Sequence, residues 1–245
     1  GTFSYFASDI AYHVTKFERG FDKVVNIWGP DYQTYVARTK AALQALGYDP
    51  GRLEIFMYQI VRLFSAGEFV RVSKYEGELA TLDELLDEVG LDAARFFYLI
   101  YSPSVPLDFD LDLVKEQSQK NPVYYVQYAH ARASSLLHEA TMRGVHLPEQ
   151  LDWSLLRTDV ERELLYRIAE LPEEVAAAAA RCEPHRLTHY AMELATAFHA
   201  FYTACRVLSD DVALSHARLA LTQAAQITLR NALNLLGISA PRFEV

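Results

Sequence analysis

Residues 69–97 read FVRVSKYEGELATLDELLDEVGLDAARFF, and this stretch decides how the chain is organised. A short apolar segment leads into a polar loop that carries Ser73-Lys74. Thr81 and Glu84 then have capping-box spacing, in which each side chain satisfies a backbone N–H of the other residue and starts a helix. A second helix is expected to begin at residues 92–95, Asp-Ala-Ala-Arg. The stretch therefore predicts a lysine loop attached to a helical domain, an arrangement suited to closing a positive charge over a nucleotide.

The residues before this stretch alternate between strand and helix patterns. Residues 23–28 and 53–60 are apolar and strand-like, and residues 31–46 between them have helical spacing. A strand, a helix and a strand with short connections predict a parallel α/β sheet. A further helix is expected over residues 9–19, and the first residues read as a strand.

The residues after this stretch contain several helical patterns. Asn121-Pro122 is a strong helix start, with Asn as the cap and Pro at the first helical position. Later helices are expected from about Asp159, Pro184 and Asp211, with apolar stripes that predict an antiparallel bundle. The segment Ser-Pro-Ser-Val-Pro at 102–106 interrupts both patterns. The predicted domains are therefore an α/β part over residues 1–105 and an all-α bundle over residues 106–245.

Composition limits the class of protein. Half of the 245 residues are hydrophobic and 12% are aromatic, which is typical of a packed globular chain. No apolar run reaches the roughly 20 residues that span a bilayer, so no membrane role is expected. The two cysteines, Cys182 and Cys205, make no disulfide framework, and a reducing cytoplasm is the expected compartment. The chain starts at Gly1 rather than at a methionine, so we expect a piece of a longer protein.

Charge argues against indiscriminate binding to nucleic acid but not against selective binding. The formal net charge is −9, yet the residues after Lys120 include eleven arginines and no lysine. Arginine stacks on bases and binds phosphate through two parallel hydrogen bonds. A genome rich in G and C would also favour arginine codons, so the bias gives only weak support to an RNA partner. His185 and His189 lack the partners of a zinc site, and no metal site is predicted.

Several segments together resemble arginyl-tRNA synthetases, which are class I aminoacyl-tRNA synthetases. Tyr5-Phe-Ala-Ser-Asp9-Ile-Ala-Tyr is similar to the Tyr-x-x-x-Asp-Ile-Ala-Tyr motif of that family. The resemblance implies that Tyr5 and Asp9 hold the substrate arginine, and a carboxylate with an aromatic ring does suit a planar cation. From the residues alone, Tyr5 could equally be an aromatic at a strand end and Asp9 a helix cap.

Two further segments resemble the nucleotide-binding part of the family, but both diverge. Asp31-Tyr32-Gln33 lies where the family has Asp-His-His, and the resemblance implies a role in ATP binding. Arg71-Val-Ser73-Lys74 stands where the family has Lys-Met-Ser-Lys, which makes these three residues candidate catalytic residues, with Lys74 on the triphosphate. Tyr75 and Glu76 are unusual neighbours, since an acid repels phosphate. A divergent active enzyme and a paralogue with impaired activation are both compatible with this loop.

The most specific resemblance lies in the helical part. Residues 122–132, Pro-Val-Tyr-Tyr-Val-Gln-Tyr-Ala-His-Ala-Arg, are similar to a helix of the family's anticodon-binding domain, which is named after its DALR motif. Tyr124, Tyr128 and Arg132 fall in one row at spacing of four, which suits stacking on unpaired bases. The resemblance implies that these residues and Gln127 contact tRNA. The alternative is that the rings pack the bundle.

The activity implied by the resemblance is ATP-dependent attachment of arginine to its tRNA through arginyl-adenylate. ATP with Mg²⁺ and L-arginine are the expected substrates, an arginine-specific tRNA is the partner, and a monomer is expected. The family's His-Ile-Gly-His element lies upstream of residues like these, so we expect that this chain alone binds tRNA without forming adenylate. Arginine-dependent pyrophosphate exchange by the chain would overturn that expectation. A non-catalytic tRNA-binding paralogue and a helical protein-interaction module remain the alternatives.

Overall fold

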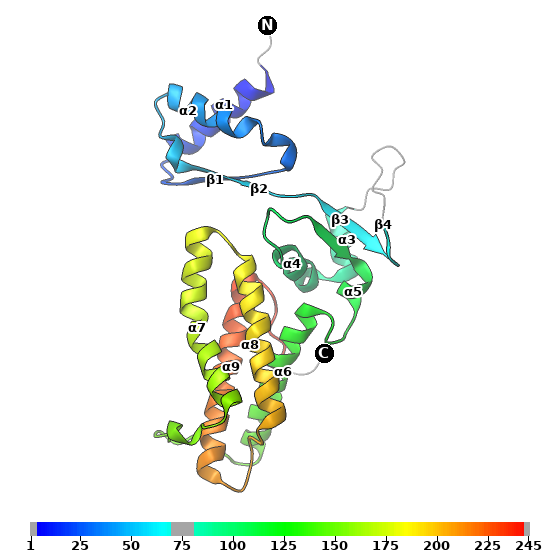
Figure 1. Cartoon of the computed structure of the whole chain (residues 1–245), viewed down its shortest axis with the longest axis vertical. Helices are drawn as coiled ribbons and strands as arrows, with labels where there is room; N and C mark the ends of the chain where they lie inside the picture. The colour runs from blue at the N-terminus through cyan, green and yellow to red at the C-terminus, as the bar shows by residue number, and fades with distance from the viewer. Residues whose placement is uncertain (1–3, 70–80, 243–245) are drawn as a thin grey trace. The chain divides into compact units, whose positions relative to one another are not determined.

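The computed structural model describes residues 4–69 and 81–242, which form two compact units. The first unit is Gly1–Arg62 with Pro103–Asp108, and the second is Leu63–Ser102 with Phe109–Val245. Figure 1 shows short helices and strands in the first unit and long helices in the second. The predicted class, α/β followed by all-α, is confirmed.

The first unit is built on two parallel strands, as predicted. Strand β1 (Val24–Trp28) pairs in parallel with β2 (Leu53–Met57), with Val24 opposite Leu53 and Trp28 opposite Met57. The connection contains the short 3₁₀ helix η1 (Pro30–Tyr32), helix α2 (Tyr35–Ala45) and a second 3₁₀ helix η2 (Pro50–Arg52). Phe17 of α1 (Tyr5–Glu18), Val24, Leu43 and Leu53 form the buried core that holds these elements together.

The start of the first unit differs from the expectation. Helix α1 begins at Tyr5, because the side chain of Ser4 caps it by accepting a hydrogen bond from the amide of Ala7 at 3.4 Å. Tyr5 is therefore not at a strand end, and Asp9 is not a cap but lies one turn inside the helix. The sequence pattern missed this because Ser4 supplies the cap five residues earlier than Asp9.

The second unit opens with the helices that the quoted stretch predicted. Thr81 and Glu84 form a complete capping box at the start of α3 (Leu82–Val89). Gly90 then turns the chain with φ of +80° into α4 (Leu91–Leu99). A sheet of β3 (Val61–Ser65), β4 (Glu68–Phe69) and β5 (Leu107–Asp110) has the order β4-β3-β5, and α5 (Leu111–Lys115) follows β5. The loop residues Arg71, Ser73 and Lys74 lie outside the described residues.

Four long helices make the bundle of the second unit: α6 (Pro122–Met142), α7 (Asp159–Arg181), α8 (His185–Ala204) and α9 (Val212–Leu236). A short 3₁₀ helix, η3 (Trp153–Leu155), precedes α7. The start of α6 is capped by Asn121 with Pro122 at the first helical position, as predicted. Phe198, Phe201 and Leu194 of α8 are fully buried, as are Leu221, Leu229 and Leu233 of α9. Within the described ranges, no helix has the length and apolar character needed to cross a membrane.

Candidate functional site

The first unit contains a pocket of 640 Å³ where the start of α1 meets the end of β1. Asp9 lines this pocket together with five aromatic residues, Tyr5, Phe6, Trp28, Tyr32 and Tyr35. Ring centroids lie 6.0 Å apart for Trp28 and Tyr32, 6.1 Å for Tyr32 and Tyr35, and 5.8 Å for Phe6 and Tyr35. A carboxylate within an aromatic wall is complementary to a flat cation, because it offers hydrogen-bond acceptors and π faces together.

A buried polar network supports Asp9 from behind. His13, which is buried, donates from Nδ1 to the backbone carbonyl of Asp9 at 2.7 Å, and its ring lies 3.6 Å from the Asp9 carboxylate. Its Nε2 therefore accepts from the amide of Asn26, whose carbonyl in turn accepts from Lys16 Nζ at 3.0 Å. Burial lowers the pKa of Lys16, although the negative charge of Asp9 opposes this shift. The network fixes the side chains of α1 against β1 and so fixes the place of Asp9.

The structure brings together some of the residues predicted for this pocket and not others. Tyr5, Asp9 and Tyr32 all line it, with Tyr5 at the rim and almost fully exposed. Asp31 and Gln33 are exposed and lie outside the lining of this pocket.

Phe6 and Tyr35 were missed as pocket residues by the sequence analysis. Phe6 precedes Asp9 by three residues and Tyr35 follows Tyr32 by three, so helical spacing was the available signal.

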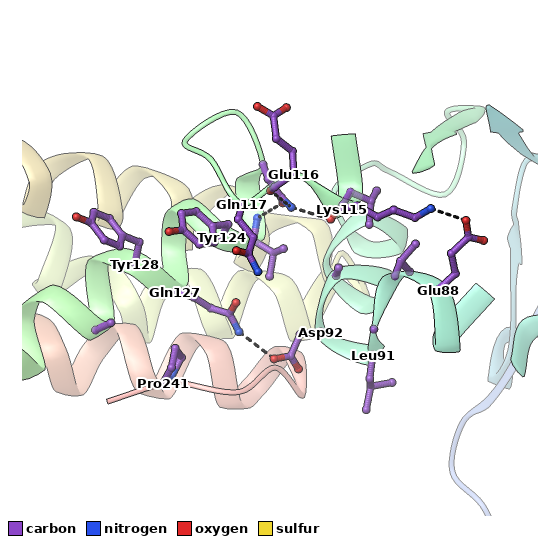
Figure 2. Close-up of a pocket in the computed structure, with 17 residues that line it drawn as sticks. Glu88, Leu91, Asp92, Lys115, Glu116, Gln117, Tyr124, Gln127, Tyr128 and Pro241 are labelled. Carbon is purple, nitrogen blue, oxygen red and sulfur yellow. Dashed lines mark hydrogen bonds and ion pairs between the residues drawn. The ribbon is translucent and has the colours of Figure 1, made fainter. Parts of the chain in front are cut away.

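A second pocket, of 580 Å³, lies in the second unit beside the first half of α6 (Figure 2). Its walls come from the turn between α3 and α4, the end of α5, and α6, and Pro241 contributes from the C-terminal segment. The rings of Tyr124 and Tyr128 lie along α6 nearly parallel, with centroids 5.9 Å apart and an angle of 10° between their planes. Two half-buried parallel rings in a pocket are a platform on which flat groups can stack.

Arg132 continues the row of the two tyrosines and is held by Tyr128 and by residues of α8. Its guanidinium lies 4.4 Å from the centre of the Tyr128 ring and 4.6 Å from that of Tyr202 on α8. Arg132 also donates to the Tyr128 hydroxyl at 2.6 Å and to Nδ1 of His199 at 3.3 Å. These contacts fix the orientation of the Tyr128 ring. Tyr202 and His199 were not predicted, and nothing local in the sequence marks them.

Gln127 makes internal contacts in this structure. Its side-chain amide donates to Asp92 Oδ2 at 2.9 Å and to the backbone carbonyl of Ser239 at 3.0 Å. Figure 2 shows Gln127 pointing away from the tyrosines toward Asp92. These two hydrogen bonds, one to α4 and one to the C-terminal segment, fix where the Gln127 side chain lies in the pocket.

Three carboxylates and one lysine line this second pocket, and each of them has a partner within the chain. Lys115 is paired with Glu88, and the carboxylate of Asp92 is occupied by Gln127 and Ser239. Glu116 accepts a hydrogen bond from Ser118 at 2.7 Å. The pocket therefore offers stacking and hydrogen bonds rather than a surplus of positive charge.

Comparison with known proteins agrees with this arrangement. Residues 126–242 match the model of the DALR anticodon binding domain, so the helical bundle belongs to that class of domain. The chain is 55% identical over 240 residues to an arginine–tRNA ligase of Moorella thermoacetica, covering 97% of the chain and 43% of the relative. A second arginine–tRNA ligase, from Desulfitobacterium hafniense, is 52% identical over 244 residues, covering 98% of the chain and 44% of the relative.

Solved structures give the same result. The Thermus thermophilus arginyl-tRNA synthetase has a TM-score of 0.82 and 25% identity, covering 99% of the chain and 50% of that structure. Over nearly its whole length the chain is similar to arginine–tRNA ligases, and it spans less than half of the length of the relatives named above.

Proposed function

We propose that this chain contributes the arginine-binding wall and the tRNA-reading domain of an arginine–tRNA ligase. The parallel Tyr124 and Tyr128 rings in the α6 pocket carry the proposal, because they lie on the helix with which the residues that match the DALR anticodon binding domain begin. The division into a catalytic part over residues 1–105 and a tRNA-binding part over residues 106–245 belongs to the same proposal. The expected location is the cytoplasm, where tRNA is charged, and one copy of the chain supplies both sites.

In the tRNA-reading role, the rings of Tyr124 and Tyr128 would form the surface on which an RNA base stacks. An unpaired base of the anticodon loop would stack against Tyr124 or Tyr128, and each such contact is worth about 1–3 kcal/mol. The side chain of Asn121 also lines the α6 pocket, but its hydrogen bonds are already made within the chain. It caps α6 by accepting from the amide of Val123 at 3.2 Å, and it donates to two backbone carbonyls. Base selection would therefore depend on the tyrosine hydroxyls and on nearby backbone groups.

In the arginine-binding role, Asp9 would recognise the side chain of the substrate. Its carboxylate would accept two hydrogen bonds from the guanidinium of L-arginine, while Trp28, Tyr32 and Tyr35 enclose the flat cation. The reaction needs no protein nucleophile, because the substrate carboxylate attacks ATP. ATP with Mg²⁺ enters as a substrate, and catalysis consists of positioning and of charge directed at phosphate.

Binding of tRNA transcripts tests the reading role. The wild-type chain is expected to bind an arginine tRNA transcript more tightly than the same transcript with substituted anticodon bases. Tyr124→Ala should weaken binding to the intact transcript by about 5- to 150-fold, corresponding to one lost stacking contact. Tyr166→Ala, which removes an exposed tyrosine of α7, is the matched control and should bind normally. Equal affinity for all anticodons would remove the proposed role.

Calorimetry with free L-arginine tests the first pocket independently of RNA. Asp9→Asn should abolish measurable binding of L-arginine, and L-citrulline, which lacks the positive charge, should not bind the wild-type chain. Asp31→Asn, in an exposed residue outside the pocket lining, is the control. If Asp9→Asn binds L-arginine as the wild type does, the carboxylate has no such role.

A further inference from the structure

The row of side chains that begins at the tyrosine platform continues to the far end of the bundle. Tyr124, Tyr128, Arg132 and Leu136 lie on one ridge of α6 at spacing of four, and Arg143 lies at the C-terminal cap of the same helix. From Tyr128 to Arg143 the helix rises about 22 Å, at 1.5 Å per residue. Arg143 is therefore too far from the platform to contact the same nucleotide.

Helix α8 runs alongside this ridge in the same direction. The Tyr125 hydroxyl bonds Thr196 at 3.3 Å, and further along both helices Arg132 lies over the ring of Tyr202. Tyr202 in turn lines a hollow of 290 Å³ together with Leu136, Arg143 and Arg206. The side chains from the platform to Arg206 thus form one continuous surface.

A second hollow, of 460 Å³, adjoins the first. It shares Arg143 and Arg206 with its neighbour and adds His146 and His216. These four residues, the distal surface, come from the end of α6, the residues after it, the connection from α8 to α9, and the first turns of α9. Four side chains that can carry positive charge meet here, whereas the one lysine of the platform pocket is paired.

The local contacts leave the distal surface able to bind an anion. Arg143 is paired with Glu139, but both side chains are about half exposed, so water already screens the pair and little is lost if phosphate replaces the carboxylate. Arg206 donates from Nε to the carbonyl of Leu208 at 3.0 Å, and its own carbonyl accepts from Arg218 at 3.0 Å. The backbone of Arg206 is therefore fixed while its side chain is exposed. Asp210 is the acidic residue in the second hollow.

We propose that the distal surface binds the phosphate backbone of the same RNA whose unpaired bases stack on the tyrosine platform. The proposal rests on the proposed function, since it takes tRNA as the ligand. It assigns the two steps of recognition to opposite ends of α6. Bases are selected by stacking at Tyr124 and Tyr128, and the flanking strand is held by charge at Arg143 and Arg206.

Salt dependence of binding separates a phosphate contact from any other role. Affinity for an arginine tRNA transcript would be measured from low to high potassium chloride for the wild-type chain, Arg143→Gln and Arg206→Gln. Each lost phosphate contact reduces the slope of log affinity against log salt by about 1. Each Gln variant is therefore expected to show a shallower slope and weaker binding at low salt. The preference for the intact anticodon should be unchanged.

Matched variants exclude indirect effects. Arg143→Lys and Arg206→Lys retain the charge and should retain the wild-type slope. Arg181→Gln removes an exposed arginine at the end of α7 and should bind as the wild type does. A thermal unfolding curve of each variant checks the fold. If Arg206→Gln does not fold, Arg143→Glu, at an exposed helix end, provides the same test and should weaken binding further.

The outcomes distinguish this inference from the proposed function. Unchanged slopes in both Gln variants would overturn the distal surface even if anticodon preference is intact. Shallower slopes without any anticodon preference would support the distal surface and overturn the reading role. A wild-type chain that binds no RNA would overturn both.

Discussion

The backbone amide of Ser239 donates a hydrogen bond to Oδ1 of Asp92 at 3.1 Å, joining the C-terminal segment to the start of α4 across 147 positions of sequence. The Ser239 hydroxyl donates to Oδ2 of the same carboxylate, and Gln127 donates to Oδ2 as well. Two residues on, the carbonyl of Pro241 accepts from Nδ1 of His130 at 2.7 Å. Asp92, the first residue of the DALR-like segment Asp-Ala-Ala-Arg at 92–95, therefore fastens the end of the bundle that forms the platform pocket.

Removing this carboxylate should destabilise the second unit. Asp92→Ala removes the acceptor of the Ser239 amide and hydroxyl, whereas Gln127 keeps the carbonyl of Ser239, and the loss of these largely exposed hydrogen bonds should cost about 0.5–1.5 kcal/mol. Urea unfolding followed by circular dichroism measures the free energy of unfolding. Asp87→Ala, an exposed acid of α3, is the control and should change stability by less than about 0.5 kcal/mol. A loss equal to that of the control would show that Asp92 does not fasten the segment.

A side chain at Gly237 should cost stability for two separable reasons, of which the second is the smaller because only the flexible end of Arg95 would have to move. The φ of Gly237 is +70°, and an added Cβ would lie 2.9 Å from Cζ of Arg95, the arginine of the DALR-like motif. The backbone conformation alone costs about 1 kcal/mol. Gly144 has a φ of +72° with open space around its Cβ position, so Gly144→Ala measures the backbone cost alone. Gly237→Ala is expected to lose more stability than Gly144→Ala. An additional Arg95→Ala substitution should recover part of the difference, and equal losses would show that the Arg95 contact is irrelevant.

Two histidines of the bundle, the buried His130 and the partly buried His199, should make the fold sensitive to mild acid. His130 donates from Nδ1 to Pro241 and accepts at Nε2 from Gln226, so it is held as a neutral ring. His199 is held likewise, with Nε2 toward the carbonyl of Tyr125 and Nδ1 toward Arg132. Burial is the main cause that lowers the pKa of both histidines in the folded chain from the ordinary value of 6.5.

The free energy of unfolding should fall as the pH falls, because the unfolded chain takes up more protons than the folded chain. Because the folded pKa is lower, the unfolded chain binds more protons once the pH falls below about 6.5, and the free energy of unfolding decreases. Urea unfolding at pH 8, 7, 6 and 5 should show this decrease in the wild-type chain. His130→Gln should make it smaller, although the variant is less stable at pH 8. His146→Gln, in an exposed residue, should leave the dependence on pH unchanged, and an unchanged dependence in His130→Gln would contradict the assignment.

Local signals were read correctly from the sequence, whereas long-range contacts were not. The capping box of Thr81 and Glu84 and the cap at Asn121-Pro122 each depend on residues within four positions, and both were confirmed. The start of α1 was misplaced because two capping residues, Ser4 and Asp9, lay close together. Arg132 meets Tyr202 only when α6 packs on α8, and no spacing rule encodes that contact. Gln127 was assigned to tRNA on the family resemblance, which stays a prediction, and nothing near it in sequence reveals its hydrogen bond to Ser239.

The contacts of Arg132 predict that it orders the platform rather than binding phosphate. Its guanidinium lies between the rings of Tyr128 and Tyr202, and a lysine at this place keeps the charge but loses the flat stacking surface. Arg132→Lys should therefore weaken tRNA binding by about 2- to 30-fold, the range expected for a lost cation–π contact. The salt dependence should stay at the wild-type slope, in contrast to Arg206→Gln. Tyr202→Leu, which removes the second ring, should give a similar loss with the same slope. If Arg132→Lys instead binds with wild-type affinity, charge alone is what matters at this position, and Arg132 belongs with the phosphate contacts.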